Sequence, residues 1–304
     1  MARRSFWVLL LMFGISTSMY AQFISFNHDQ MVAATAANPF GRYDDGRPKV
    51  PDALLEKLRG CSMEEIWAVL QKHDYTHQYE GNFQVTHPEE SHRMVGRAVT
   101  AQYMPVRPDL FKVTESHNQG VELAHPGEGN LGHGTAYRRM IDVLQKSDVL
   151  VVDMFGNVDG GGPTGDNMAT AIYAATHDGG MVIDGAVRDL NGILEIPMNV
   201  FFRAPHPAAV NGVMLSGINI PIRIGGVTVV PGDVVVGDRE GVYFIPPEFV
   251  QEILTTAEIT HVHDEWTKAK FMTGKYKASD LYPTPWDPQL QREYQEYLKQ
   301  KLGK

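Results

Sequence analysis

Two short runs of consecutive apolar residues constrain the fold of this chain more than any other feature. Residues 149–152 form one run, with an aspartate on each side, and residues 181–183 form the other. Runs of this length are typical of strands that are buried on both faces. A glycine-rich loop at 160–163 and a predicted helix from 166 to 177 separate them. The order strand, loop, helix, strand predicts a crossover between parallel strands, and therefore an α/β fold.

The first 21 residues have the pattern of a secretory signal peptide. Arg3 and Arg4 precede an apolar run at 6–15, and a small residue, Ala21, follows at the expected cleavage position. The run is short for a permanent membrane span, although an uncleaved anchor is the alternative. We therefore expect a periplasmic or secreted protein that begins at Gln22 and has no stable membrane insertion after removal of the signal.

Composition excludes several classes of protein. The chain has 27 Lys and Arg against 36 Asp and Glu, a net charge of -9, and 43% hydrophobic residues. This profile is globular, and the acidic balance argues against binding to nucleic acid or to an anionic membrane. The single cysteine, Cys61, rules out an intrachain disulfide framework, and we expect it to be a buried apolar side chain.

The remaining chain divides into an arm, a main domain and a tail. Residues 22–61 are predicted to form a loosely structured arm and a first helix, with Gly60 separating two short helices within 51–70. The main domain is predicted over 62–259, with a strand at 95–101, hairpins between 220 and 245, and an amphipathic helix at 248–259. Residues 260–304 are predicted to be a helical extension.

Histidines outside the main pattern are predicted to be structural. His73, His77, His87 and His92 lie in a polar stretch without firm ligand spacing, which favours a solvated loop over a metal cluster. His261-x-His263-Asp264 lies near a helix end and is also expected to be structural.

The most informative stretch runs from Gly165 to Asp189. Gly165 opens the predicted helix, so the N–H groups of Asn167 and Met168 are expected to face outward at a positive helix end, where a carboxylate or phosphate binds well. The next strand ends in Arg188-Asp189, and ligands of open α/β sheets bind at the carboxyl ends of strands. Helix terminus and Arg-Asp pair are therefore expected to share one mouth.

These residue types suit enolate chemistry on a 2-oxo acid. Arg188 can clamp a carboxylate through two hydrogen bonds, and Asp189 can hold a hard cation such as Mg²⁺. A cation there would stabilise the negative charge that develops as the C3–C4 bond breaks. On spacing alone, a capping Asp166 and a structural Arg188–Asp189 turn are the favoured interpretation, because such dipeptides are frequent. Glycines 160–162 lack the lysine of a P-loop, and neither a dinucleotide fingerprint nor a serine nucleophile elbow is present.

The ordered motifs at 149–153, 165–169, 182–189, 220–238 and 241–246 closely resemble those of the RraA-like family. This family includes 4-hydroxy-4-methyl-2-oxoglutarate aldolases and the regulator of ribonuclease activity A, and its members often carry a dimethylmenaquinone methyltransferase label. The resemblance covers about residues 62–259. It implies a swivelling β/β/α domain, assembled as a homotrimer or homohexamer with active sites at subunit interfaces.

The resemblance also implies roles for individual residues. Arg188 matches the arginine that binds the pyruvoyl carboxylate, and Asp189 matches the aspartate that ligates Mg²⁺ or another divalent cation such as Mn²⁺. The backbone amides of the loop containing Gly165, Asp166, Asn167 and Met168 are implied to complete the substrate site. The implied reaction is retro-aldol cleavage or decarboxylation of a 2-oxo acid through a pyruvate enolate.

Three features depart from the family pattern. The family motif Arg-Asp-x-x-Glu/Asp has an acidic residue where this chain has Gly192, so one carboxylate is missing. Residues 114–136 are predicted to be an inserted loop, in which His125 and His133 are candidate substrate contacts, although a place in the loop without such a contact is the favoured interpretation of each. The predicted export signal is unusual for a family of cytoplasmic enzymes. A non-catalytic binding or regulatory protein of the cell envelope is therefore the second hypothesis.

Overall fold

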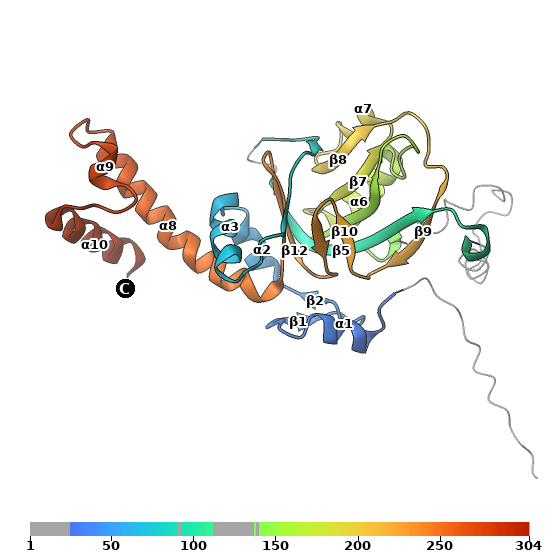
Figure 1. Ribbon diagram of the computed structural model, residues 1–304, viewed down its shortest axis with the longest axis horizontal. Coiled ribbons are helices and arrows are strands. Elements are labelled where there is room, and N and C mark those ends of the chain that lie inside the picture. Colours follow the sequence, from blue (N-terminus) through green and yellow to red (C-terminus); the bar gives the residue numbers. More distant parts are fainter. Residues whose placement is uncertain (1–24, 90–92, 112–136, 138–139, 304) are drawn as a thin grey trace, which may run out of the picture.

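The computed structural model describes residues 25–89, 93–111, 137 and 140–303, and among these residues it contains a nine-stranded mixed sheet (Figure 1). Its strands are β3 (Tyr79–Glu80), β4 (Gln84–Val85), β5 (Met94–Pro105), β6 (Asp148–Asn157), β7 (Gly180–Val187), β8 (Val200–Pro205), β9 (Val213–Ile218), β12 (Val234–Asp238) and β13 (Gly241–Ile245). Two hairpins accompany the sheet: β1 (Gly41–Arg42) with β2 (Pro48–Lys49), and β10 (Ile222–Ile224) with β11 (Val227–Val229).

Helices surround the sheet and extend beyond it. They are α1 (His28–Ala34), α2 (Asp52–Leu58), α3 (Met63–Lys72), α6 (Asp166–Thr176), α7 (Leu190–Ile193), α8 (Val250–Phe271), α9 (Ala278–Leu281), α10 (Pro288–Leu302) and the 3-10 helix η3 (Pro247–Phe249).

The parallel core of the sheet is the part that the apolar runs predict. β5, β6, β7 and β8 are neighbours in this order and run parallel, with Val151 of β6 opposite Val182 of β7. Helix α6 connects β6 to β7. The predicted α/β fold and the hairpins near the end of the domain are thereby confirmed.

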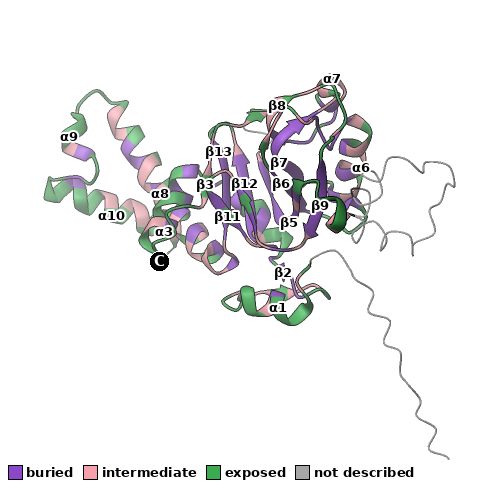
Figure 2. Cartoon of the chain, turned by 45° about the vertical axis from the view of Figure 1, so that its right-hand side comes forward, coloured by how far each residue is buried: buried purple, intermediate pink, exposed green. Residues whose placement is uncertain are grey.

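Both faces of this parallel core are covered, which explains why its strands are apolar without alternation. On one face, Leu150 and Ile183 pack with Ile172 of α6. On the other face, Val151 and Val182 belong to a cluster that includes the β10–β11 hairpin. Figure 2 shows the resulting band of buried residues through the centre of the sheet.

A third cluster packs α2, α3 and the first half of α8 against the antiparallel end of the sheet. Leu58, Ile66 and Ile253 are fully buried there. Helix α3 begins at a capping box in which Ser62 and Glu65 exchange hydrogen bonds. The two short helices predicted within 51–70 are α2 and α3. Cys61 is buried as expected, and burial raises the pKa of its thiol to about 11.

The tail is a helical extension attached through α8. This helix continues without a break to Phe271, so the boundary predicted between 259 and 260 falls within it. Its second half projects from the sheet and carries α9 and α10 (Figure 1). A small cluster of Trp266, Leu281 and Leu290 joins α8, α9 and α10.

The arm has more regular structure than the sequence predicts. Helix α1 begins at a capping box between Asn27 and Gln30, and β1 and β2 form a hairpin. The predicted signal peptide and the predicted insertion at 114–136, with His125 and His133, lie outside the described residues. Within the described part of the chain, no helix has the length and apolar character needed to cross a membrane.

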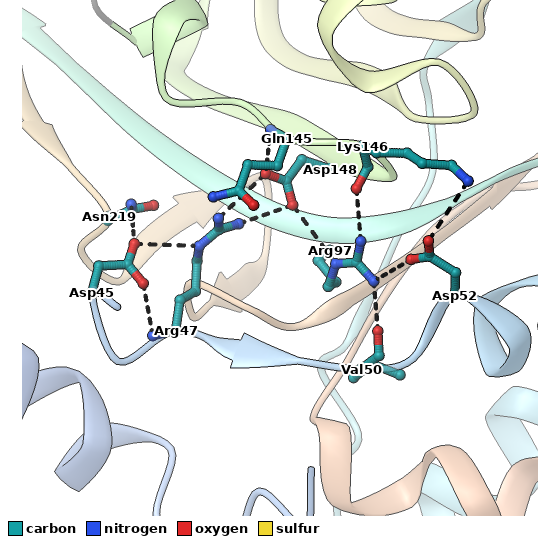
Figure 3. A network of polar contacts seen from close by, with 9 residues as sticks. All are labelled: Asp45, Arg47, Val50, Asp52, Arg97, Gln145, Lys146, Asp148 and Asn219. Atoms are coloured by element: carbon teal, nitrogen blue, oxygen red, sulfur yellow. Dashed lines mark hydrogen bonds and ion pairs between the residues drawn. The ribbon is translucent and has the colours of Figure 1, made fainter. Parts of the chain in front are cut away.

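A buried ion-pair network holds this arm on the sheet (Figure 3). Both terminal nitrogens of Arg47 donate to the two oxygens of Asp148, at 3.1 and 3.3 Å. The Arg47 side chain is 2% exposed and that of Asp148 is fully buried. Arg97 of β5 lies beside them, 3.8 Å from Asp148, and donates to Asp52 and to the Lys146 carbonyl. The network therefore joins the β1–β2 arm, β5 and the first residue of β6.

Removing Arg47 should be costly because it leaves the Asp148 carboxylate buried without its bidentate partner. Burial raises the pKa of Asp148, and the nearby arginines oppose that shift. We expect Arg47→Ala to lower the free energy of unfolding by about 3 kcal/mol or more in urea denaturation at pH 7. The control is Arg107→Ala, whose ion pair with Asp109 is exposed and should contribute little to stability. Equal stability of the two variants would contradict this role.

A second buried carboxyl, that of Asp233, pins the turn between β11 and β12. Its Oδ2 accepts a hydrogen bond from the Val230 N–H at 2.8 Å, and its backbone carbonyl accepts one from Ala98 of β5. Burial raises the pKa of Asp233 to about 7, against the Val230 hydrogen bond, and the charge of Glu248 adds to the increase. The native state therefore keeps this carboxyl protonated at pH values where the unfolded chain ionises it.

This difference predicts a pH dependence of stability. The stabilisation is fully present below about pH 4 and is lost as the pH rises through about 7, because the native state binds the extra proton in this window. Asp233→Asn keeps an oxygen acceptor for Val230 and removes the titration. Between pH 4.5 and 7, wild-type stability should fall relative to the variant by up to about 1.4 kcal/mol per pH unit. Parallel pH profiles of the two proteins would refute the assignment.

Candidate functional site

Three loops meet at the carboxyl ends of β6, β7 and β8. The loop after β6 and the loop after β8 are joined by main-chain hydrogen bonds, from Gly162 N–H to the Ala208 carbonyl and from Val210 N–H to the Gly162 carbonyl, both 3.1 Å. Arg188, directly after β7, donates its backbone N–H to the Thr164 carbonyl at 3.0 Å. Main-chain hydrogen bonds therefore join the three loops at the carboxyl edge of the parallel strands, where the sequence predicts the mouth, and we call these loops its walls.

Glycines allow these loops to approach the Arg-Asp pair closely. A Cβ atom on Gly162 would lie 2.7 Å from the Arg188 backbone nitrogen. A Cβ atom on Gly165 would lie 2.4 Å from Asp189 Oδ2 and 3.0 Å from Arg188 Cζ. The structure thus brings Gly165, Arg188 and Asp189 together at the N-terminus of α6, as the sequence suggests.

Arg188 and Asp189 form an ion pair that leaves one edge of the guanidinium unused. Arg188 Nη1 donates to Asp189 Oδ2 at 2.8 Å, and the two side chains are 34% and 42% exposed. Arg188 Nε is buried and has no hydrogen-bond partner among the described residues. A buried donor without a partner is unfavourable, so this nitrogen is a point where a ligand oxygen would be stabilised. Asp189 has a φ of 55° and sharply redirects the chain between β7 and α7.

The N-terminus of α6 is less open than the sequence predicts. The N-cap, Gly165, offers no side-chain hydrogen bond, but Asp166 Oδ1 accepts from the Asn167 N–H at 2.7 Å. Asn167 therefore donates to its own neighbour in this conformation. Met168 is half-buried and packs against the core of the α6 face. Asp166 is thus a local capping residue whose carboxylate also borders the mouth.

Gly192 occupies the position where the family motif has an acid, and its surroundings explain the glycine. A Cβ atom at 192 would lie 2.7 Å from Asp166 Cβ and 2.8 Å from Asp166 Oδ2. The Asp166 side chain therefore fills the space into which a residue-192 side chain would extend. The sequence shows the missing carboxylate, but only the contact between α6 and α7 shows what replaces it.

Two residues near the mouth were missed by sequence reasoning. Tyr137 is buried, and its hydroxyl is hydrogen-bonded to the Thr164 hydroxyl beneath the loop. Burial raises the pKa of Tyr137, while Thr164 and Arg188 oppose the shift. His206 follows β8, and its backbone N–H donates to the carbonyl of Val187. This hydrogen bond places His206 next to the point where Arg188 follows β7. Its position directly after a parallel strand is the signal that could have identified it.

The donor set fits a cation that keeps most of its water. Among the described residues, no group of three or more His, Cys, Asp or Glu side chains is arranged to hold a metal. Asp189 lies close to Gly165, Asp166 follows Gly165 in the chain, and both carboxylates are at least partly exposed. Mg²⁺ commonly binds through one or two carboxylates and retains several waters, so these two residues are compatible with it.

The other histidine candidates are engaged in structural contacts. His261 pairs with Glu65 at 3.0 Å, and His263 contacts Asp264 and the ring of Tyr294. His73 pairs with Glu252, and His87 bonds to the Ile196 carbonyl at 2.7 Å. None of these places a histidine at the mouth.

Comparisons with known proteins show what this chain is similar to. Residues 49–244 match the model of the RraA-like family, described as aldolase/RraA. A protein of Halalkalibacterium halodurans, named as a candidate 4-hydroxy-4-methyl-2-oxoglutarate aldolase, is 35% identical over 158 residues, covering 51% of this chain and 73% of that protein. Protein DlpA of Legionella pneumophila is 26% identical over 238 residues, covering 77% of this chain but 34% of that protein.

A solved structure shows the same fold. RraAS2 of Streptomyces coelicolor, described as an unusual member of the RNase ES inhibitor RraA protein family, superposes with a TM-score of 0.59 at 23% identity. The superposition covers 77% of this chain and 100% of that chain. At this identity the likeness concerns the fold alone.

Gly165→Ala tests whether the close approach of Gly165 to Arg188 and Asp189 is needed for function and not for folding. The added methyl group should displace the Asp189 carboxylate and the Arg188 guanidinium, which are ends of flexible side chains. We expect ligand binding or turnover to fall about tenfold or more, with a melting temperature within a few degrees of wild type. Gly41→Ala, where a Cβ atom meets nothing within 4 Å, is the control. Unchanged function in Gly165→Ala would show that the approach is incidental.

Proposed function

The chain belongs to the RraA-like family, and we propose that it is an exported, divalent-metal-dependent lyase that acts on a 2-oxo acid. The family match and the relatives named as candidate aldolases support lyase chemistry. Export rests on the signal-like pattern of residues 1–21, and metal dependence rests on the carboxylates at the mouth. The observation that carries the proposal is Arg188, whose Nη1 pairs with Asp189 while its buried Nε remains without a partner.

Arg188 is proposed to bind the carboxylate of the substrate. Its Nη1 donates to Asp189, so the Nε edge is the part of the guanidinium that a substrate carboxylate would contact. The hydrogen bond from the Arg188 backbone to Thr164 fixes the start of this side chain, and Asp189 fixes its end. A positioned guanidinium loses little freedom when the substrate binds, which favours an oriented complex.

Asp189 and Asp166 are proposed to hold the cation. A bound Mg²⁺ or Mn²⁺ would act as a Lewis acid for the negative charge that develops on the keto oxygen when the C3–C4 bond breaks. Asp189 is held in a left-handed conformation at the mouth, and Asp166 is held by the start of α6. The main-chain walls of the mouth add fixed dipoles around the reacting carbonyl without having to reorganise.

A non-catalytic binding or regulatory protein of the envelope is the second candidate function. The observation that favours it is Gly192, which removes the third carboxylate of the family motif, with Asp166 filling its space. The two functions differ in their response to metal. A ligand that binds only the native state stabilises it, by about 2.7 kcal/mol at a hundredfold excess over its Kd. A melting temperature that does not respond to Mg²⁺ or Mn²⁺, together with absent turnover, would favour the binding protein.

Pyruvate release from oxaloacetate and from 4-hydroxy-4-methyl-2-oxoglutarate tests the lyase directly. With Mg²⁺ or Mn²⁺, and after subtraction of the metal-only rate, we expect release that EDTA abolishes. Arg188→Ala should lose about 10²–10³-fold in kcat/KM while retaining its melting temperature, because the clamp is half-exposed and not part of the core. Arg223→Ala removes an exposed arginine on β10 and should leave kcat/KM unchanged. Near-normal turnover in Arg188→Ala would overturn the assignment.

A further inference from the structure

A cavity of about 260 Å³ lies between the arm and the sheet, away from the mouth. The end of α1 and the turn after it, residues 34–37, form one wall, and the prolines at 246–247 form another. Asp233 also lines the cavity, and its backbone carbonyl accepts a hydrogen bond from Ala98, which lies opposite Val149 near the start of β6. The cavity is therefore near the amino-terminal ends of the parallel strands, whereas the mouth is at their carboxyl ends.

The charged side chains that line this cavity are acidic. Asp233 is 4% exposed and Glu248 is half-buried, and neither forms an ion pair within the described part of the chain. Of the described residues that line the cavity, none is Lys, Arg or His. Arg42 contacts Thr35 at the edge, but it donates to Thr35 and to the Gly46 carbonyl and does not line the space. A hollow of this charge attracts a positively charged ligand.

One oxygen of the buried Asp233 carboxyl is left available to a ligand. Oδ2 accepts the hydrogen bond from the Val230 N–H at 2.8 Å, whereas Oδ1 has no hydrogen bond to any described residue. A polar group that is withdrawn from water gains stability when a partner is supplied. Because Asp233 lines the cavity, a donor bound there would supply the partner that the protein does not.

Tyr75 adds an aromatic ring to the two carboxyls. Its ring makes an edge-on contact with the ring of Phe249 at 4.8 Å, which holds it at the cavity. Burial raises the pKa of Tyr75, and the charges of Glu248 and Asp233 add to the increase, so its hydroxyl stays neutral. Aromatic rings beside carboxylates are suited to organic cations, which gain from both the charge and the ring.

The remaining walls favour an organic cation over a metal ion or an anion. Methyl groups of alanines and the rings of two prolines surround much of the space, and these surfaces suit an alkyl chain better than the water shell of Mg²⁺. Among the described residues, no group of three or more His, Cys, Asp or Glu side chains could hold a metal. Pro246 and Pro247 have no N–H, so this turn before α8 offers few donors to an anion.

We propose that this cavity binds a small organic cation, a short alkylammonium, with Asp233 and Glu248 as counter-ions and the alanine and proline walls around its alkyl part. The ammonium donates to Asp233 Oδ1. The bound cation touches both the arm and the sheet, so it stabilises the attachment of the arm. The site shares no residue with the mouth, and it does not depend on the proposed lyase activity.

Titration calorimetry of the full-length protein with n-butylammonium tests the site, in an amine-free buffer at constant ionic strength. At pH 8 we expect saturable binding with a Kd on the order of 1 mM, which is ordinary for so small a ligand. 1-Butanol and butyrate have an alkyl chain of similar length without the positive charge. Each should bind at least about tenfold more weakly.

Variants of the lining residues test which groups hold the cation. Asp233→Asn, which keeps an acceptor for the Val230 N–H, and Glu248→Gln should each weaken binding about tenfold or more. Glu64→Gln makes the same change at an exposed position of α3 and is the matched control, with unchanged affinity. Ala37→Phe fills the cavity from an exposed position, so it should abolish binding without lowering the melting temperature.

The proton on Asp233 gives an independent readout. Burial raises the pKa of Asp233 to about 7, and a bound cation favours the ionised carboxylate, so affinity should increase as the pH rises through this value. From pH 6 to pH 8 the increase should be about tenfold in wild type and small in Asp233→Asn. Alkylammonium ions, like the lysine side chain, stay protonated in this range. Glu248 and Tyr75 are the other titratable side chains among the described lining residues, and Glu248→Gln should retain the increase.

Three results would overturn the proposal. Equal affinity for 1-butanol and n-butylammonium, unchanged in Asp233→Asn and Glu248→Gln, would identify a merely apolar cavity. Displacement of n-butylammonium by MgCl₂ at equal ionic strength, with Mg²⁺ the tighter ligand, would identify a metal site. Absence of saturable n-butylammonium binding at about 50 mM would show that the cavity takes no such cation. Each result leaves the pyruvate-release assay of the mouth unaffected.

Discussion

The buried pair of Arg47 and Asp148 is the interaction on which the arrangement of this chain depends. It attaches a polar arm, more than a hundred residues away in sequence, to the first residue of a central parallel strand. A buried carboxylate and a buried guanidinium are each unfavourable alone, so the pair specifies one position for the arm. With the arm in place, Arg97 also finds its partners, and the amino-terminal edge of β5 and β6 is closed.

The candidate site lies at the opposite edge, where β6, β7 and β8 have their carboxyl ends. β6, β7 and β8 are covered on both faces by apolar clusters, so their direction is fixed and their carboxyl ends meet. In the loops that follow, glycines stand where the backbone comes closest to the Arg-Asp pair: Gly162 lies against Arg188, and Gly165 lies against Arg188 and Asp189. Packing of the strands and absence of Cβ atoms together position the Arg-Asp pair, and Arg188 Nε is left buried without a hydrogen-bond partner among the described residues.

Much of this arrangement could be predicted because it depends on local sequence. The apolar runs predict β6 and β7, the glycine at 165 predicts the start of α6, and the order of elements places Arg188 and Asp189 at its mouth. Other features arise from contacts between distant segments. The replacement of a residue-192 side chain by Asp166 depends on how α7 packs against α6, and the position of His206 depends on the register of β8. The continuation of α8 to Phe271 was missed because its second half lacks a strong apolar face until α10 packs on it.

The walls of the mouth are held by hydrogen bonds between main-chain atoms of Gly162, Ala208 and Val210. Such bonds need the backbone and not a particular side chain, apart from the glycine. Neighbouring loop positions can therefore change their side chains during evolution without refolding the loops. A scaffold of this kind can acquire new ligands through single substitutions at its rim, while the Arg188–Asp189 pair stays the same.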